Sequence, residues 1–326
     1  MLRRTVLSLL LLMALLAVAG CAAVPPADAP QNITVALDWT PNINHSGLYA
    51  AVALGYFEAQ GLTVDIVEPG ETLAPQLVAA GRAEFGISYQ EEVTFARAKG
   101  VPVVSIAAVI QHNTSCFAAP KAKGIKTVAD FAGKVYGGWG GAVEEGLINY
   151  LMEREGKPGS VQSVIIGEAD FFAACDREID FSWIYYGVTG IEAELTNQPI
   201  DVIMLRDIDP AFDLYTPVVI GEESWLDNNR EVARRFMTAL SLGHQYADAH
   251  PAQAAEILLA AEDGLDGELV RAGQDWLAGQ YKGDAPYWGW QDEAVWRGFA
   301  EWLISCGMLE PGFKAEEAFS NEYLYN

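Results

Sequence analysis

Three residues that can bind a flat, polar molecule lie close together near the start of the chain: Trp39, Asn42 and His45. They follow the β-branched run at residues 33–37, which predicts a strand, so they fall in the loop at its carboxyl end. An indole there can stack on a planar ring, an interaction of about 0.5–1.5 kcal/mol beyond area burial. The amide and the imidazole can exchange hydrogen bonds with ring substituents. The alternatives are a tryptophan packed in the core and a histidine that caps the helix after it.

A second group is the glycine-rich turn at residues 137–141, Gly-Gly-Trp-Gly-Gly, which is followed by Glu144. The turn lies between an expected strand and an expected helix, where backbone N–H groups bind anions or carbonyl oxygens. It lacks the Gly-Lys-Ser/Thr ending of a P-loop and does not match G-x-G-x-x-G. We expect Trp139, Gly140 and Glu144 to contact a ligand. The alternative is a tight turn that backbone geometry alone requires.

Aromatic residues also stand at the ends of two other expected strands. Tyr89 follows the strand at residues 85–88, in the position equivalent to Trp39. Trp183, Tyr185 and Tyr186 complete a strand that begins near residue 180. Because successive side chains of a strand point to opposite faces, these three cannot all be buried on one side. At least one of them is expected to face the ligand, and all three are candidates together with Tyr89.

Strand and helix patterns alternate along most of the chain. Apolar runs predict strands at residues 33–37, 61–67, 85–88, 103–109, 134–136, 161–166, 180–183 and 201–205. Helical patterns are found between them at residues 48–54, 73–80, 91–99, 144–153 and 171–177, and continuously from residue 231 onward. Repeated strand–helix units predict an α/β fold with open, mostly parallel sheets, whose ligands bind outside the carboxyl ends of the strands.

The composition limits the class of protein. The chain has 326 residues, of which 51% are hydrophobic and 20% charged, and its formal net charge is −24. This length suits two domains of about 100–200 residues each. Nucleic acid is excluded as a partner, because phosphate backbones bind clustered Lys and Arg. With neither H-E-x-x-H nor C-x-x-C spacing, we expect no metal and no cofactor; Cys116, Cys175 and Cys306 either include one bridged pair or are buried thiols.

The N-terminus predicts export. Arg3 and Arg4 precede an apolar run at residues 6–19, too short for a bilayer span of about 20 residues but typical of a signal peptide. The run ends in Val-Ala-Gly-Cys, which matches the bacterial lipobox and predicts lipidation of Cys21. We therefore expect a signal peptide at residues 1–20 and an Ala- and Pro-rich tether at 21–31 that holds the protein on the outer face of the cell membrane. The alternatives are a plain signal peptide and an N-terminal anchor helix.

Several motifs together resemble one known family: Asp38-Trp39-Thr40-Pro41-Asn42, His45-Ser46-Gly47, Gly55-Tyr56-Phe57, the stretch 61–64 and the stretch 81–87. They are similar to the substrate-binding proteins of ABC importers that are related to the thiamine-pyrimidine synthases. The resemblance runs from about residue 33 to residue 326. It implies a two-lobed periplasmic-binding-protein fold of type II, closing over one small molecule, with a helical C-terminal tail and an ABC permease in the membrane as partner.

The same resemblance implies two crossover strands, which we expect near residues 116–121 and 205–216. Lobe 1 is then formed by residues 32–117 together with 216–326, and lobe 2 by residues 118–215. The resemblance also implies an alternative, a pyrimidine synthase that consumes its own histidine and needs a cysteine-rich motif. At the matching positions the chain has Glu91 and Glu92 in place of the histidine, and no cysteine at residues 211–215. We therefore expect a binding protein and not an enzyme.

The ligand implied by the family is a vitamin-type aromatic heterocycle. Pyrimidine-binding relatives place a glutamate shortly after the lobe 2 strand, where this chain has Tyr186. Without that acceptor a buried amine is left unsatisfied, at about 1–3 kcal/mol. This favours riboflavin, whose polyol and carbonyls Asn42, Glu144 and the glycine-rich turn can meet, over a thiamine-precursor pyrimidine of the formylaminopyrimidine type. A third class, an adhesive lipoprotein without a small ligand, predicts an exposed apolar patch.

Overall fold

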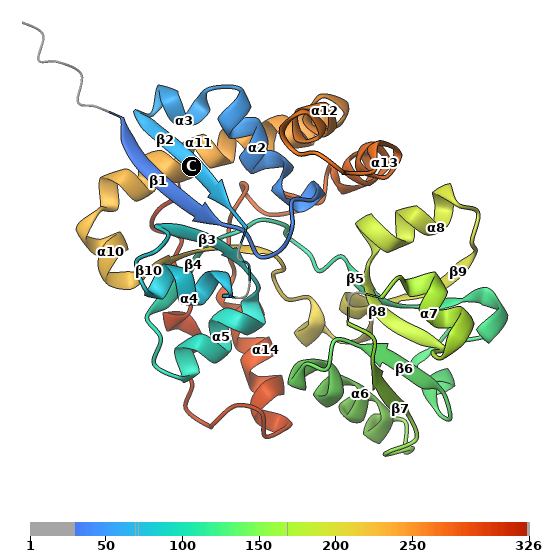
Figure 1. Ribbon diagram of the computed structural model, residues 1–326. Coiled ribbons are helices and arrows are strands. Elements are labelled where there is room, and N and C mark those ends of the chain that lie inside the picture. Colours follow the sequence, from blue (N-terminus) through green and yellow to red (C-terminus); the bar gives the residue numbers. More distant parts are fainter. Residues whose placement is uncertain (1–29, 69, 71, 168, 325–326) are drawn as a thin grey trace, which may run out of the picture.

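The computed structural model describes residues 30–68, 70, 72–167 and 169–324. These residues form two lobes, each built on its own five-stranded sheet (Figure 1). The predicted signal peptide, Cys21 and almost all of the predicted tether lie outside the described residues. Gln31, the last residue assigned to the tether, already begins the first strand.

The first sheet has the strand order β2-β1-β3-β10-β4. β1 pairs in parallel with β2 and β3, whereas β10 runs antiparallel to both of its neighbours. The sheet is therefore mostly parallel, as the repeated strand–helix pattern predicts. Its strands are β1 (Gln31–Ala36), β2 (Leu62–Val67), β3 (Phe85–Ser88), β4 (Val103–Ala108) and β10 (Val218–Glu222).

The second sheet repeats this arrangement with the order β7-β6-β8-β5-β9. β6 pairs in parallel with β7 and β8, and β5 runs antiparallel to β8 and β9. In each sheet the antiparallel strand is thus the fourth in order. The strands are β5 (Ser115–Pro120), β6 (Val135–Gly138), β7 (Gln162–Ile165), β8 (Phe181–Tyr185) and β9 (Ile200–Met204).

The chain passes between the sheets twice, through residues 109–114 and again through residues 213–217. We call these segments the first and second crossover. The first crossover precedes residues 116–121, where it was predicted, because residues 115–120 form β5 of the second sheet. The predicted lobe boundary between residues 117 and 118 therefore falls inside a strand. β5 is a short segment of mixed residue types whose partners β8 and β9 come much later in the chain, so no local pattern reveals the pairing.

Helices cover both sheets (Figure 1). Those that follow the strands of the first sheet are α2 (Ser46–Ala53), α3 (Tyr56–Ala59), α4 (Ala74–Ala79) and α5 (Gln90–Ala98). Lobe 2 carries α6 (Ala142–Arg154), α7 (Phe171–Arg177), α8 (Ile191–Leu195) and α9 (Leu205–Ile208). Short 3₁₀ turns are η1 (Ile43–His45), η2 (Lys121–Lys123), η3 (Val128–Phe131), η5 (Pro210–Phe212) and η6 (Ala315–Glu317), and η4 (Tyr186–Gly190) is a π-helical turn.

The C-terminal part is helical, as predicted: α10 (Glu223–Asn228), α11 (Arg230–Ala249), α12 (Pro251–Ala261), α13 (Gly267–Leu277) and α14 (Glu293–Ser305). α11 packs closely on α2, where Gly47 and Gly243 leave room for the two backbones to approach. α14 buries Trp296 and Trp302, and Trp302 contacts Phe212 of η5, so this helix joins the lobes. None of the described helices is long and apolar enough to cross a bilayer.

Candidate functional site

Two tryptophans from different lobes meet at the carboxyl ends of the sheets. Trp39 follows β1 of the first sheet and Trp139 follows β6 of the second. Their indole rings lie edge to face, with centroids 5.7 Å apart and planes inclined by 85°. They keep 44% and 55% of their surface exposed, so neither is a core residue. The two rings thus meet where the lobes face each other, and each keeps exposed aromatic surface there.

The loop that carries Trp39 is held by His45. The backbone N–H of Asn42 donates to Nδ1 of this imidazole at 3.2 Å, and Nε2 lies 2.6 Å from Oδ1 of Asp38. Because a backbone amide only donates, Nδ1 is the acceptor, and the ring is the neutral tautomer that donates from Nε2 to Asp38. His45 is buried and both of its nitrogens are used inside the loop. His45 thus completes the capping box of η1, whereas its side chain makes no capping bond to α2, the helix that the sequence alternative had it cap.

Asn42 is likewise used within the loop. Its side-chain oxygen accepts from the backbone N–H of Asn44 at 3.0 Å, and its amide nitrogen donates to the carbonyl of Thr40 at 2.9 Å. These bonds form the N-cap of η1 and fix the direction in which the chain leaves β1. Asn42 therefore shapes the loop that presents Trp39, while its polar atoms are already partnered.

A group of acids and tyrosines lies beside this loop. Burial alone would raise the pKa of Asp38, but hydrogen bonds from His45 and from Tyr89 lower it. The pKa of Tyr89 is raised by burial and by the negative charge of Asp38. Tyr89 is the N-cap residue of α5, so the ends of β1 and β3 bring these side chains together. This is the juxtaposition expected from their equivalent positions in the sequence.

Tyr185 reaches the same group from lobe 2. Burial raises its pKa, and so do the charges of Glu91, Asp38 and Glu92, all of which belong to the first lobe. Its hydroxyl lies 3.4 Å from Oγ1 of Thr216 in the second crossover, and the residue keeps 36% of its surface exposed. Tyr185 is thus surrounded by protein on several sides while one side still meets solvent, which is the situation of a side chain at a binding site.

The carboxyl group of Glu91 in this region has a raised pKa. Burial, then the like charges of Glu92 and of Glu144 from lobe 2, raise its pKa to about 7. Glu92 is held by a hydrogen bond of 2.7 Å from the hydroxyl of Ser88. Both acids stand in the first turn of α5. The sequence analysis treated them only as replacements for a histidine; two consecutive acids so soon after Tyr89 and the end of β3 were the signal that they lie beside this group.

Backbone amides of the glycine-rich turn are already bonded to a carboxylate of the same segment. The carboxylate of Glu144 accepts from the backbone N–H of Trp139 at 2.9 Å, from that of Gly141 at 3.0 Å and from the hydroxyl of Tyr136 at 2.8 Å. The expectation of free amides at this turn is therefore wrong for Trp139 and Gly141. Gly140 has φ +82°, where a side chain is strained, and an added Cβ would lie 2.8 Å from Ile165. The glycines thus serve a tight turn that presents Trp139.

The other two aromatic candidates of β8 lie elsewhere. Trp183 is half-buried and packs edge-on against Phe117 of the lobe 2 core. Tyr186 donates to Glu194 at 2.6 Å, and its ring lies against Trp276 of α13 with centroids 5.1 Å apart. Tyr185 is the last residue of β8, whereas Tyr186 begins the π-helical turn η4, so the two neighbouring side chains have different partners. Of the three, Tyr185 is the one that joins the acids of lobe 1.

The described residues contain no group of three or more His, Cys, Asp or Glu side chains placed to hold a metal. Cys116, Cys175 and Cys306 are free thiols in this part of the chain, so the bridged pair considered from the sequence is not formed. Burial raises the pKa of Cys116 to about 12, which makes it an inert core thiol.

Comparison with proteins of known sequence finds relatives along almost the whole chain. The formylaminopyrimidine-binding protein of Halalkalibacterium halodurans is 29% identical over 95% of this chain and 97% of its own length. The riboflavin-binding protein RibY of Chloroflexus aurantiacus is 24% identical over 99% of each chain. The 4-amino-5-hydroxymethyl-2-methylpyrimidine phosphate synthase of Legionella pneumophila is 26% identical over 72% of this chain and 75% of its own.

Solved structures agree in fold. The periplasmic aliphatic sulphonate-binding protein SsuA of Escherichia coli superposes with a TM-score of 0.69, covering 90% of this chain and 99% of that one at 16% identity. The two-lobed periplasmic-binding-protein fold expected from the resemblance is thus confirmed. The family model described as NMT1/THI5 like matches residues 42–254, which is more than half of the sequence. The chain therefore belongs to the NMT1/THI5-like family.

Proposed function

We propose that this chain is the extracytoplasmic substrate-binding protein of an ABC importer and that it holds a flat nitrogen heterocycle between its lobes for delivery to a permease. The observation that carries the proposal is the meeting of Trp39 and Trp139 from opposite lobes, beside Tyr185. Relatives named as binding proteins that match over nearly the full length support the same reading.

The acids beside these rings favour one class of heterocycle. The negative charges of Asp38, Glu91 and Glu92 raise the pKa of Tyr185, and the charge of Glu144 in the other lobe raises the pKa of Glu91. Ionised carboxylates only accept hydrogen bonds, so they recognise a ligand that offers N–H groups. An aminopyrimidine offers such donors from its exocyclic amine. We therefore propose a formylaminopyrimidine-type ligand first, stacked on the tryptophans, with Glu91 as an acceptor for its amine.

Riboflavin is the second candidate, although the sequence favoured it. That preference depended on Tyr186 taking the place of a glutamate at the ligand. Since Tyr186 is bonded to Glu194 and packed on Trp276, it gives no argument for a larger ring. What still favours riboflavin is the amount of aromatic surface, with Trp39, Trp139 and Tyr185 able to cover an isoalloxazine.

Binding without catalysis is the activity that the site residues support. The histidine that the resemblance implies for the synthases corresponds to Glu91 and Glu92, and the cysteine-rich motif corresponds to residues 211–215, which contain no cysteine. One of the four histidines, His45, has both of its nitrogens engaged in holding its loop. We therefore propose a receptor in which these groups recognise the ligand and leave it chemically unchanged.

Membrane attachment is proposed through a lipid on Cys21. The lipobox at residues 18–21 and the Arg-containing leader are the support for this step. If it is correct, the wild-type chain expressed in bacteria partitions into the detergent phase of a Triton X-114 extract, and Cys21→Ala moves it into the aqueous phase. Equal partitioning of the two proteins would contradict lipidation.

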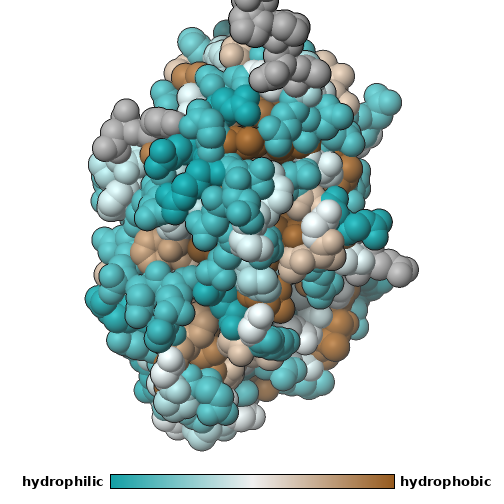
Figure 2. All heavy atoms as spheres, turned by 90° about the vertical axis from the view of Figure 1, so that its left-hand side faces the viewer, coloured by the Kyte–Doolittle hydropathy of each residue, from teal (hydrophilic) through white to brown (hydrophobic). Residues whose placement is uncertain are grey.

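The adhesive alternative receives little support from the surface. On the face drawn in Figure 2, hydrophilic residues predominate and hydrophobic ones form small separate groups. Outside the tryptophan pair, the exposed large apolar side chains are spread over both lobes, for example Val52 of α2 and Leu242 of α11 in the first and Leu195 of α8 in the second. Scattered single residues of this kind are normal on a soluble protein and need no partner.

Isothermal titration calorimetry of ligand-free protein with formylaminopyrimidine and with riboflavin tests the proposal. We expect one-to-one binding of the pyrimidine, weakened at least tenfold by Trp39→Ala and by Glu91→Gln, and unchanged by Leu242→Ala on the exposed face of α11. Tight binding of riboflavin alone would overturn the ligand assignment and keep the receptor function. Binding of neither, by protein with a cooperative melting transition, would contradict the proposal as a whole.

A further inference from the structure

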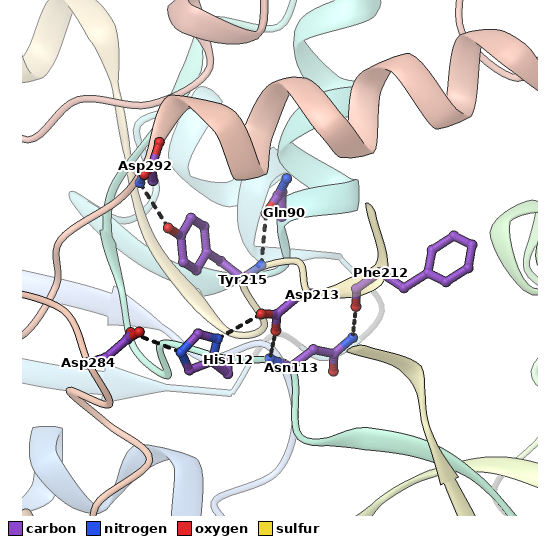
Figure 3. Close-up of polar contacts among 8 residues, drawn as sticks. All are labelled: Gln90, His112, Asn113, Phe212, Asp213, Tyr215, Asp284 and Asp292. Carbon is purple, nitrogen blue, oxygen red and sulfur yellow. Dashed lines mark hydrogen bonds and ion pairs between the residues drawn. The ribbon is translucent and has the colours of Figure 1, made fainter. Parts of the chain in front are cut away.

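His112 joins three segments that are far apart in the sequence (Figure 3). It lies in the first crossover, with Nδ1 2.7 Å from Oδ2 of Asp213 in the second crossover. Nε2 lies 3.0 Å from Oδ1 of Asp284, in the segment between α13 and α14. One imidazole ring therefore connects both passages between the lobes to the C-terminal part of the chain.

The geometry specifies the charge of this ring. Both partners are carboxylates, which accept hydrogen bonds when ionised and have no proton to give. A neutral imidazole carries one N–H and can serve one of them, so a ring bonded at both nitrogens carries two protons and a positive charge. His45 is the contrasting case, because a backbone amide donates to its Nδ1 and leaves that ring neutral. The two histidines thus differ in charge for a reason that the contacts make explicit.

The same contacts tie the crossovers to each other. The second oxygen of Asp213 accepts from the backbone N–H of Asn113 at 2.8 Å, and the Asn113 side chain donates to the carbonyl of Phe212 at 2.8 Å. Further along, the backbone N–H of Val109 donates to the carbonyl of Pro217 at 3.0 Å. When two lobes of such a fold close or open, the backbone change is absorbed in the connecting segments. His112 and Asp213 therefore stand where lobe movement is controlled.

The second crossover is also held from its other side. The backbone N–H of Tyr215 donates to Oε1 of Gln90 in α5 at 2.8 Å, and the Tyr215 hydroxyl accepts from the backbone N–H of Asp292 at 2.8 Å (Figure 3). These bonds involve no group that titrates near neutral pH. The His112–Asp213 contact is thus the link between the crossovers whose strength changes with pH.

We propose that His112 is a positioning residue that clamps the two crossovers through Asp213, and that loss of its proton releases the clamp and shifts the arrangement of the lobes. The proposal concerns the two-lobed fold and does not depend on which ligand is bound. In the protonated state the ring satisfies both carboxylates and holds the lobe arrangement described above. After deprotonation one carboxylate loses its donor, and the crossovers are joined by fewer bonds.

The direction of the pH effect follows from the groups around the ring. Burial lowers the pKa of His112, but the hydrogen bonds and charges of Asp213 and Asp284 outweigh it and raise the pKa above 6.5. The clamp is therefore complete below about pH 6.5 and is lost as the pH rises through the raised value. Asp284 is 84% exposed and contributes less than Asp213. The other charged or titratable groups on the neighbouring segments are Tyr215 of the second crossover and, in the segment of Asp284, Tyr281, Lys282, Tyr287 and Asp292.

Distance measurement between the lobes tests the clamp without any ligand. Spin labels at Val52→Cys in lobe 1 and Leu195→Cys in lobe 2, both at exposed positions, report lobe separation in the full-length protein in detergent on a Cys306→Ser background. We expect the distance distribution to shift between about pH 6 and about pH 9. Its midpoint should equal the pKa of His112 measured by NMR of ¹³C-labelled histidine.

Three variants decide whether His112 is responsible. His112→Gln should abolish the pH-dependent shift, and Asp213→Asn, which keeps an oxygen for the Asn113 N–H, should move its midpoint to lower pH. His250→Gln, at the exposed histidine that follows the last residue of α11, should leave the shift unchanged. A wild-type distance that does not change with pH, or a shift that persists in His112→Gln, would overturn the proposal. If His112→Gln does not fold, the pH midpoint of the distance shift in Asp213→Asn decides: a lower midpoint supports the proposal and an unchanged one overturns it.

Discussion

Trp39 and Trp139 occupy equivalent places in the two lobes and touch each other. Each follows the second strand in the order of its sheet, β1 in one and β6 in the other, and the rings meet edge to face at 5.7 Å. Two sheets with the same strand order thus present the same residue type toward each other across the lobes. Aromatic rings that meet in this way can separate to admit a flat molecule and contact it from both sides.

Removal of either ring should weaken binding while leaving the fold intact. Trp39→Ala and Trp139→Ala each lose an exposed side chain, so the melting temperature should stay close to that of the wild type. The affinity for the ligand should fall about tenfold or more, because a stacked ring loses buried area and about 0.5–1.5 kcal/mol of ring contact. Calorimetric titration and thermal melting of the same samples separate the two effects. A variant that melts early but binds normally would contradict this assignment.

The carboxylate of Glu144 should be needed for the shape of the glycine-rich turn. Glu144→Ala leaves the amides of Trp139 and Gly141 and the hydroxyl of Tyr136 without their acceptor. We expect a loss of about 1.5–3 kcal/mol in the free energy of unfolding, typical of hydrogen bonds to a charged group. Denaturant titration measures this loss. Glu145→Ala, at the exposed neighbouring position, is the matched control and should change stability by less than about 0.5 kcal/mol.

The raised pKa of Glu91 predicts a pH-dependent cost to folding. Between pH 4.5 and about pH 7 the unfolded chain has lost this proton while the folded protein keeps it, so stability falls as the pH rises through that range. Glu91→Gln removes the cost. It should be neutral near pH 4 and stabilising near pH 8, by about 1 kcal/mol because solvent still reaches the side chain. Melting curves at both pH values test this, with the exposed Glu58→Gln as control; equal effects at the two values would exclude the assignment.

Two helical glycines should respond in opposite ways to alanine. At Gly47 in α2 an added Cβ overlaps the ring of His244, which is stacked on Trp288 and buried. Gly298 in α14 has open space around the same atom. We expect Gly47→Ala to destabilise by about 1–3 kcal/mol through overpacking and Gly298→Ala to stabilise by about 0.4–1 kcal/mol. Urea unfolding of the two variants side by side tests whether α2 is held as closely as the structure indicates.

Much of the architecture can be predicted from local patterns. The strands predicted at residues 33–37 and 85–88 and the helix predicted at 91–99 lie within one or two residues of β1, β3 and α5. The face of each strand or helix that is buried can also be predicted, because a hydrophobic period of 2 or 3.6 residues shows which face is apolar before the packing partner is known. The loop positions of Trp39, Tyr89 and Trp139 follow from the strand ends, so the sequence also predicted which aromatic residues stand at the edges of the sheets.

Other features depend on contacts between residues that are distant in the chain. No local pattern identified β5 or β10 themselves, and the presence of β5 at residues 115–120 places the first crossover at residues 109–114. Which of Tyr185 and Tyr186 lies beside the acids of lobe 1 depended on where β8 ends and the turn η4 begins. Likewise, only the folded structure shows that the carboxylate of Glu144 accepts hydrogen bonds from backbone N–H groups of its own turn.

The sequence by itself determined that this is an acidic, two-lobed α/β protein with aromatic residues at its strand ends, because composition and periodicity are local properties. Only the tertiary structure decided the charges of His45 and His112. Nδ1 of His45 accepts a hydrogen bond from a backbone amide, so this ring is neutral, whereas His112 faces carboxylates at both nitrogens and is charged. An imidazole has the same chemistry at every position, and its protonation follows from the partners that the fold brings within hydrogen-bond distance.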